Sequence, residues 1–304
     1  MATAARRAGR LLEAFCRRDL RIAAAVAAAL VVFGPAAAEE AQAYAAPRSA
    51  VHEVSAKDSA RAYRLYVMTP PGYGAAENAA RRYPVIYLND GELFFMAAAG
   101  APLLSYYNKA LEETILVGVS YAVGEDPIAS RQRDLTPVSD ASFAGATGGA
   151  DAYLAFLRDV AAPAIESRYR ADPARRTLAG HSFGGAFATY VLLTEPALFA
   201  NYIIVSPAYW YADHALAGFE QRYAEAHEDL PARVYMAAGD LEGPKGGLKK
   251  IDLANDMSAF AARLGSRGYD SLELRAEILD DGVTHATSLQ AAWLRAVGWL
   301  FPAQ

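Results

Sequence analysis

Residues 180–184 (GHSFG) have the G-x-S-x-G spacing that places a nucleophilic serine at a sharp turn. The serine of such a turn has a strained backbone, and the flanking glycines leave room for it. The apolar run at residues 177–179 precedes the pentapeptide, so we expect the turn to join a strand to a helix. Ser182 is therefore a candidate nucleophile, and an ordinary Gly/Ser turn is the alternative.

A serine hydroxyl is a poor nucleophile at neutral pH and needs a base within hydrogen-bond reach. Three of the five histidines follow Ser182 in the chain. Two of them, His214 and His227, lie in a polar stretch that we expect to be helical. His285 lies between a predicted strand and the last predicted helix, where reactive groups gather in an α/β sheet. His285 is the candidate base, and a solvated loop histidine is the alternative.

The elements that must position these residues alternate along the chain. Runs typical of strands occupy residues 61–68, 83–88, 115–120, 177–179, 202–205, 233–238 and 272–279. Helix-compatible stretches occupy residues 93–112, 151–169, 186–193, 212–228, 251–264 and 287–300, with a kink expected at Pro163. This alternation predicts an α/β fold with a doubly wound, mostly parallel sheet, helices on both faces and no large separate cap domain.

The first residues differ in composition from the rest of the chain. Six arginines precede an apolar run at residues 22–33, which ends at Gly34-Pro35 and three alanines. This pattern predicts a secretory signal peptide at residues 1–38, and an uncleaved anchor is the alternative. A linker at residues 39–49 and a catalytic domain at residues 50–304 would follow. We therefore expect a periplasmic or secreted protein without stable membrane association.

The composition excludes several function classes. The whole chain has a net charge of −5, and removal of six arginines and two acids with the signal peptide gives −5 − 4 = −9. Such an acidic protein without a basic patch is not expected to bind nucleic acid. The only cysteine, Cys16, lies in the predicted signal, which excludes cysteine nucleophiles from the mature chain. No metal-ligand motif occurs, and no cofactor is expected.

Five blocks in the same order resemble the putative esterase family of the α/β-hydrolase superfamily, which includes esterase D and the ferric siderophore esterases. The blocks are residues 83–91 (YPVIYLNDG), 133–137 (RDLTP), 178–185 (LAGHSFGG), 202–211 (YIIVSPAYWY) and the segment around His285. The resemblance spans roughly residues 50 to 302. It implies an α/β-hydrolase fold and hydrolysis of carboxylic esters.

The resemblance also implies an acid and an oxyanion hole. The superfamily usually carries the acid about three residues after a glycine such as Gly239, which favours Glu242, with Asp240 as the alternative and a Ser-His dyad also possible. One oxyanion donor is the backbone amide of Phe183, directly after the serine. The likeness to esterase D implies that the second donor is the amide of Glu92.

Four further residues are candidate substrate contacts. Siderophore esterases look similar around Arg131 and Arg133, and guanidinium groups suit anionic catecholates. Pairing of Arg133 with Asp134 or with a loop carbonyl is the structural alternative. Tyr209 and Trp210 follow a predicted strand and are candidates for the wall of an aromatic acyl pocket, with core packing as the alternative.

The function predicted from the sequence is that of a serine carboxylesterase acting through an acyl-enzyme on Ser182. Ferric siderophore trilactones are the substrate class that the resemblance implies. A feruloyl or short-chain ester hydrolase and an acyltransferase are alternatives that share the same catalytic residues. A noncatalytic ligand-binding protein of the same fold is a further alternative.

Overall fold

The computed structural model describes residues 43–303 except residues 58 and 249. Residues 47–304 form one compact unit, and we describe that unit alone. The predicted signal peptide, residues 1–38, lies outside the described residues. Among the helices that are described, none is long and apolar enough to span a bilayer.

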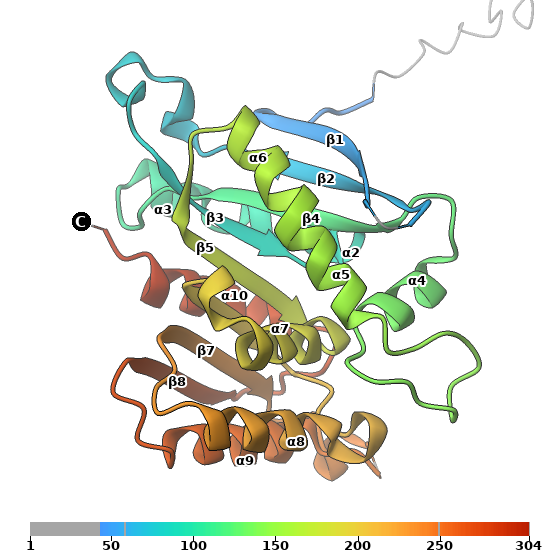
Figure 1. Cartoon of the computed structure of the whole chain (residues 1–304). Helices are drawn as coiled ribbons and strands as arrows, with labels where there is room; N and C mark the ends of the chain where they lie inside the picture. Colours follow the sequence, from blue (N-terminus) through green and yellow to red (C-terminus); the bar gives the residue numbers. More distant parts are fainter. Residues whose placement is uncertain (1–42, 58, 249, 304) are drawn as a thin grey trace, which may run out of the picture. The chain divides into compact units, whose positions relative to one another are not determined.

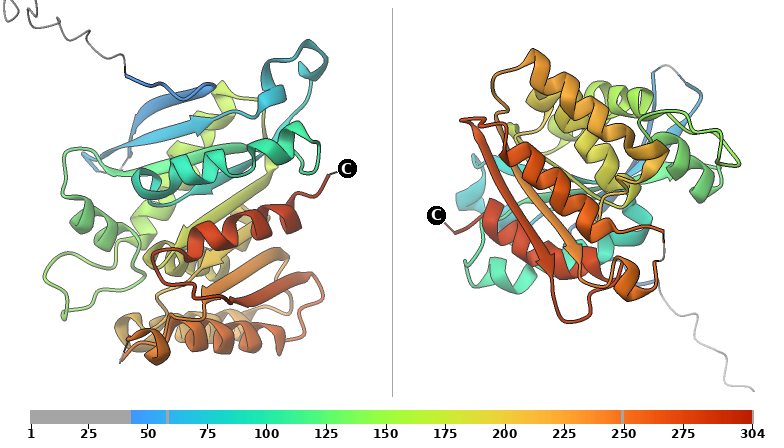
Figure 2. Two further views of the ribbon diagram at one scale, coloured as in Figure 1. Left: turned by 180° about the vertical axis from the view of Figure 1, so that it is seen from behind. Right: turned by 90° about the horizontal axis from the view of Figure 1, so that it is seen from below.

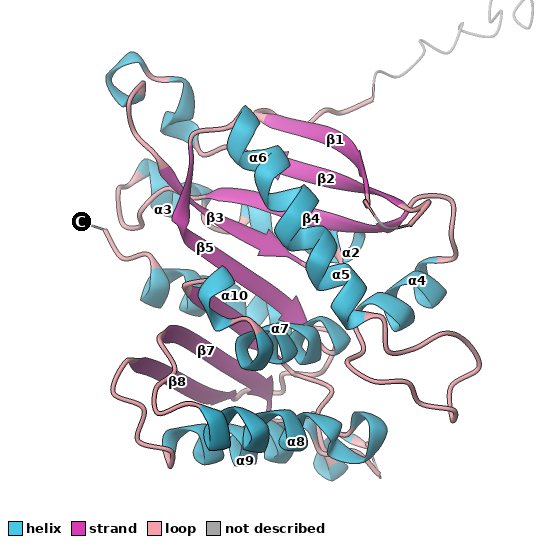
Figure 3. Cartoon of the chain, in the orientation of Figure 1, coloured by secondary structure: helices cyan, strands magenta, loops and turns pink. Residues whose placement is uncertain are grey.

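One mixed sheet forms the centre of this unit (Figures 1 and 3), and its strands lie in the order β1-β2-β4-β3-β5-β6-β7-β8. The strands are β1 (Ser49–Ser55), β2 (Ala62–Met68), β3 (Tyr83–Leu88), β4 (Ile115–Ala122), β5 (Ala171–His181), β6 (Asn201–Val205), β7 (Ala232–Gly239) and β8 (Leu272–Leu279). β2 pairs antiparallel with β1 and β4, and the other strand pairs are parallel. The predicted α/β fold is confirmed.

Helices cover both faces of the sheet, as Figure 2 shows from behind and from below. They are α2 (Gly91–Gly100), α3 (Leu103–Tyr107), α4 (Pro127–Asp134), α5 (Ala150–Phe156), α6 (Ala162–Arg168), α7 (Phe183–Thr194), α8 (Tyr211–Ala226), α9 (Leu253–Gly265) and α10 (Ser288–Leu300). Because side chains alternate across a strand, Val85 and Tyr87 of β3 pack with α5 to α9. Ile86 and Leu88 of the same strand pack with α2 and α10 on the other face.

Three sequence predictions differ from the structure. The strand β1 begins at residue 49, inside the predicted linker, and its half-exposed edge position explains its weak apolar signal. Helix α4 lies in a stretch where no helix was predicted. The predicted helix 93–112 is broken at Pro102 into α2 and α3. Before Pro163, residues 157–161 form a π-helical turn, which fits a proline ring that would crowd the preceding turn of an α-helix.

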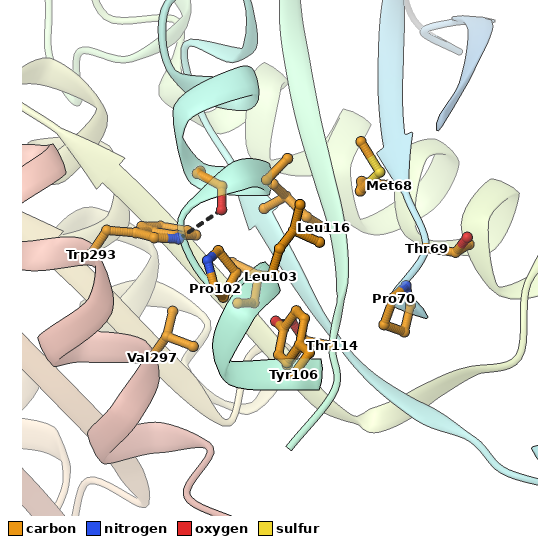
Figure 4. Close-up of a pocket in the computed structure, with 13 residues that line it drawn as sticks. Met68, Thr69, Pro70, Pro102, Leu103, Tyr106, Thr114, Leu116, Trp293 and Val297 are labelled. Atoms are coloured by element: carbon orange, nitrogen blue, oxygen red, sulfur yellow. Dashed lines mark hydrogen bonds between the residues drawn. The ribbon is translucent and has the colours of Figure 1, made fainter. Parts of the chain in front are cut away.

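A small cavity of about 20 Å³, room for about one water, lies where α2 and α3 meet α10 (Figure 4). Beside it, the indole nitrogen of Trp293 in α10 donates a hydrogen bond to the carbonyl of Ala98 in α2, with a distance of 3.0 Å. Leu116 and Met68 line the cavity from the sheet. The indole hydrogen bond links α10 to α2 on the same face of the sheet.

The start of α2 lies directly on strand β4. A Cβ atom on Gly91 would lie 2.9 Å from the backbone of Gly118 and of Val119, and a Cβ on Gly118 would lie 2.9 Å from the ring of Phe95. Gly91 has no space for a larger residue, because backbone atoms cannot move aside, and a larger residue at Gly118 would displace the packed ring of Phe95. These two glycines therefore fix the distance between the amino end of α2 and the sheet.

We expect Gly91→Ala to destabilise the protein by about 1–3 kcal/mol, because the added methyl group forces α2 away from β4. The matched control is Gly100→Ala at the other end of the same helix, where a Cβ meets nothing within 4 Å. That control should gain about 0.5 kcal/mol from the higher helix propensity of alanine. Urea unfolding of the two variants tests this, and equal stabilities would contradict the proposed close packing.

Candidate active site

Ser182 lies at the turn between β5 and α7 with φ 60° and ψ −117°, a conformation that costs on the order of 1–3 kcal/mol for a residue other than glycine. Its amide donates to the Val205 carbonyl at 3.0 Å, and its carbonyl accepts from the Ala208 amide at 3.1 Å. A Cβ on Gly180 would lie only 2.1 Å from the carbonyl oxygen of Gly184, so the turn requires glycine there. The serine hydroxyl is partly exposed and makes no hydrogen bond with the described residues.

His285 and Glu242 form a close pair. The Nδ1 atom of His285 lies 2.7 Å from Oε2 of Glu242, and the carboxylate is fully buried while the imidazole is 39% exposed. The other carboxylate oxygen accepts hydrogen bonds from the Ser206 hydroxyl at 2.6 Å and from the Gly239 amide at 2.8 Å. Burial alone would raise the pKa of Glu242, but these hydrogen bonds outweigh it and hold the pKa below its usual value.

Asp240, the alternative acid, faces a different set of donors. Its carboxylate accepts from the backbone amides of Gly282 at 3.1 Å and Val283 at 2.9 Å, and it pairs with Lys245 at 3.3 Å. The loop that Asp240 holds in this way is the one that leads to His285. Of the two carboxylates that the sequence left open, Glu242 is the one that contacts the histidine.

The two backbone amides predicted as oxyanion donors belong to the first turns of two helices. Phe183 begins α7, and Glu92 is the second residue of α2. Amides in a first turn have no partner within the helix and carry the positive end of the helix dipole. The two helix starts are adjacent, because a Cβ on Gly184 would lie 3.1 Å from Oδ2 of Asp90.

The side chain of Glu92 contacts strand β4. Its carboxylate accepts from the amide of Tyr121 at 3.1 Å, and burial raises the pKa of Glu92, while the hydrogen bond from Tyr121 acts in the opposite direction.

Arg131 forms a salt bridge with Asp90, the residue before the start of α2. Its Nε and Nη2 atoms lie 2.7 and 3.2 Å from the two carboxylate oxygens of Asp90, and Nη2 also donates to the His181 carbonyl at 3.2 Å. Asp90 is fully buried, has φ 57°, and accepts a further hydrogen bond from the hydroxyl of Tyr121. The sequence placed Asp90 only in the block at residues 83–91, before the predicted donor Glu92, so its buried salt bridge with Arg131 was missed.

Arg133 and Tyr209, which were also predicted to contact the substrate, are bound to other residues of the protein. Arg133 is paired with Asp134 at 2.8 Å and with Glu125, which is the structural alternative considered for it. The hydroxyl of Tyr209 bonds to Thr189 at 2.8 Å in the core, where only 3% of Tyr209 is exposed. In this conformation neither side chain is free to meet a substrate.

An aromatic wall lies where the start of α7 meets the start of α8. We use this name for the ring cluster of Phe143, Phe183, Trp210 and Tyr211, whose neighbouring centroids lie 5.4 to 6.4 Å apart. The Tyr211 hydroxyl donates to the Val138 carbonyl at 2.8 Å, which connects the wall to the loop between α4 and α5. The sequence pointed to Trp210 but missed Phe143, which stands alone in a polar loop without any periodic signal.

No cluster of metal-ligating side chains occurs among the described residues. The arrangement of the site consists instead of an exposed serine hydroxyl, a histidine held by a buried carboxylate, and two helix amides. Together these groups can transfer an acyl group through a tetrahedral intermediate.

The model of the putative esterase family matches residues 56–268, which is more than half of the chain. The chain belongs to this family. The Ferri-bacillibactin esterase BesA of Bacillus subtilis is 29% identical to it over 216 residues, which cover 66% of this chain and 73% of that protein. The siderophore triacetylfusarinine C esterase of Aspergillus fumigatus is 29% identical over 186 residues, covering 58% of this chain and 62% of that protein.

A solved structure shares the fold of this esterase. The BES protein from Bacillus cereus superposes with a TM-score of 0.74 at 23% identity, covering 86% of this chain and 97% of that one. The resemblance found in the sequence is therefore confirmed, and the protein is a carboxylic ester hydrolase of the α/β-hydrolase fold.

The lowered pKa of Glu242 predicts how the stability of this esterase depends on pH. The Glu242 carboxylate stabilises the folded state above its unfolded pKa of about 4.3, and this contribution is lost as the pH falls through the lower folded pKa. We therefore expect the wild type to lose stability more steeply with falling pH in this range than Glu242→Gln. Urea unfolding at a series of pH values measures both slopes. Glu77→Gln, at an exposed position, is the control, and equal slopes for wild type and Glu242→Gln would contradict the prediction.

Proposed function

We propose that this esterase is a serine hydrolase in which Ser182 is the nucleophile, His285 the base and Glu242 the acid. The observation that carries the proposal is the buried Glu242 carboxylate 2.7 Å from Nδ1 of His285, on the same sheet edge as the strained turn of Ser182. Because Nδ1 is bound to the carboxylate, Nε2 is the nitrogen left to accept the serine proton.

In the proposed reaction, Oγ of Ser182 attacks the ester carbonyl carbon and its proton passes to His285. The amides of Phe183 and Glu92 stabilise the resulting oxyanion, and His285 returns the proton to the leaving alcohol as the ester C–O bond breaks. Water then attacks the acyl-enzyme by the same route, giving the acid and free Ser182. The negative charge on Glu242 stabilises the imidazolium formed in both steps.

We further propose esters that carry aromatic groups as substrates, with siderophore esters as the leading class. Two relatives are named for siderophores, and the aromatic wall beside Ser182 supplies ring surface for an aryl group. Arg131 and Arg133 are already paired with Asp90, Asp134 and Glu125, so they leave little unpaired positive charge for a polyanionic ferric complex. This pairing favours a neutral feruloyl-type ester as the second candidate.

The proposed location is the periplasm or the exterior of the cell, on the basis of the arginine-rich and apolar pattern of residues 1–38. Cell fractionation tests this location: protein in the periplasmic or culture-medium fraction should have the mass of the chain without the predicted signal peptide. A full-length protein retained in the cytoplasm would contradict it.

Replacing Ser182 by alanine should abolish hydrolysis of p-nitrophenyl acetate, because no other group on this edge is placed as the nucleophile. Glu242→Gln should lower kcat by at least about a hundredfold, since the neutral amide cannot stabilise the imidazolium. Asp240→Asn is the matched control and should retain most of the activity, because Asp240 contacts the loop and not His285. Activity in Ser182→Ala equal to that of the wild type would refute the serine mechanism, and a larger loss in Asp240→Asn than in Glu242→Gln would reverse the assignment of the acid.

The aromatic wall should affect KM for aryl-bearing esters more than for acetate esters. We expect Trp210→Ala to raise KM about three- to tenfold for ferric enterobactin or ethyl ferulate, which corresponds to the loss of one ring contact, and to leave KM for p-nitrophenyl acetate within about twofold. Tyr107→Ala, which removes an exposed ring from α3, is the control.

The siderophore assignment has a test of its own. Hydrolysis of ferric enterobactin no faster than that of simple esters would contradict this assignment.

A further inference from the structure

A chain of four buried polar side chains lies behind the Glu242–His285 pair. The Ser206 hydroxyl lies 2.6 Å from Oε1 of Glu242 and 2.7 Å from the hydroxyl of Ser288, which in turn lies 3.1 Å from Nε2 of His181. Ser206, Ser288 and Glu242 are fully buried, and His181 is 6% exposed. The chain joins the ends of β5, β6 and β7 to the first turn of α10.

Proton counting indicates which nitrogen of His181 carries the hydrogen. A carboxylate can only accept hydrogen bonds, so the Ser206 hydroxyl donates to Glu242 and shares the same proton with the oxygen of Ser288. Ser288 in turn donates to the carbonyl of His285 at 3.4 Å. The oxygen of Ser288 is therefore left to accept from His181, which requires the Nε2–H form of the His181 ring.

His181 suits the end of such a chain because it stays neutral. Burial lowers its pKa to about 3, and the neighbouring His285 and Arg131 act in the same direction while Glu242 opposes them. Its ring packs against His285 at a centroid distance of 4.4 Å and against Phe94 at 5.3 Å. A charged His181 in this place would repel the imidazolium that His285 forms during catalysis.

The backbone of Ser206, like that of Ser182, has a positive φ. Ser206 has φ 47°, a value that residues other than glycine rarely adopt, and its amide donates to the Ala237 carbonyl at 2.7 Å. Strain that persists at a buried residue marks a position where the surrounding structure dictates the conformation, and such positions cluster at functional sites. Here the strained conformation directs the hydroxyl to the acid.

We propose that Ser206, Ser288 and His181 are positioning residues that orient the Glu242 carboxylate toward His285 through a buried hydrogen-bond chain, with His181 as a neutral Nε2–H tautomer. The proposal rests on the function proposed above. Because Ser206 and the Gly239 amide both donate to Oε1 of Glu242, the other oxygen, Oε2, is the one that faces Nδ1 of His285.

Nitrogen-15 NMR of histidine-labelled protein tests the tautomer without any substrate. We expect His181 to give the signals of an Nε2–H tautomer with unprotonated Nδ1, unchanged between about pH 5 and 9, since its pKa lies far below this range. The matched spectrum of His181→Asn assigns the resonances. An Nδ1–H tautomer, or a titration of His181 within this range, would overturn the proposal.

The second test is the pH profile of kcat/KM in variants of Ser206. Both Ser206→Ala and Ser206→Gly should move the acid limb of this profile to higher pH by up to about one unit, because the carboxylate loses a charge-assisted hydrogen bond. Glycine adopts φ 47° without strain, so the second variant separates loss of the hydroxyl from a backbone effect. Ser288→Ala should give a smaller shift in the same direction.

The control is Thr177→Val, four residues before His181 in β5, which removes a fully buried hydroxyl that accepts from Asn201. It should reduce stability without moving the acid limb of the pH profile. An unchanged acid limb in Ser206→Gly would overturn the positioning role. If the protein hydrolyses no ester, the NMR signals of His181 still report on the chain, so failure of the proposed chain and failure of the proposed function are distinguished.

Discussion

The backbone conformation of Ser182 is the constraint on which the rest of the site depends. A residue with φ 60° and ψ −117° persists only because Gly180 admits the returning carbonyl of Gly184 and because Val205 and Ala208 hold the turn by hydrogen bonds. Both of these partners come from β6 and the loop that follows it. The same strand end carries the hydroxyl that holds Glu242, so Ser182 and Glu242 are positioned by one strand.

Opposite charges lie on opposite sides of Ser182. The first turns of α2 and α7 present amides and the positive ends of two helix dipoles, whereas the buried carboxylate of Glu242 lies behind His285. These charges suit a reaction in which an oxyanion forms on one side and an imidazolium on the other. The salt bridge between Asp90 and Arg131 holds the start of α2 in place. The close contact of Gly91 with β4 sets the distance between this helix start and the sheet.

Much of this arrangement could be predicted from the sequence, because the elbow and the buried strands are local patterns. The order of Ser182, Glu242 and His285 followed from strand alternation and family resemblance. Contacts between distant residues could not be predicted: Glu242 and His285 are 43 positions apart, and Ser206 and Ser288 are 82 apart. For the same reason Arg131 could be predicted as a substrate contact, but not the buried Asp90 that already pairs with its guanidinium group.

The central claim is that Ser182 is the single residue activated for acyl transfer. Reaction with an organophosphorus fluoridate, followed by intact-mass measurement and peptide mapping, tests it directly because the reagent is captured by an activated nucleophile and needs no knowledge of the natural substrate. We predict one covalent adduct per chain, located on Ser182 and absent from Glu242→Gln on the same timescale. An unmodified protein, or an adduct on a different residue, would contradict the account.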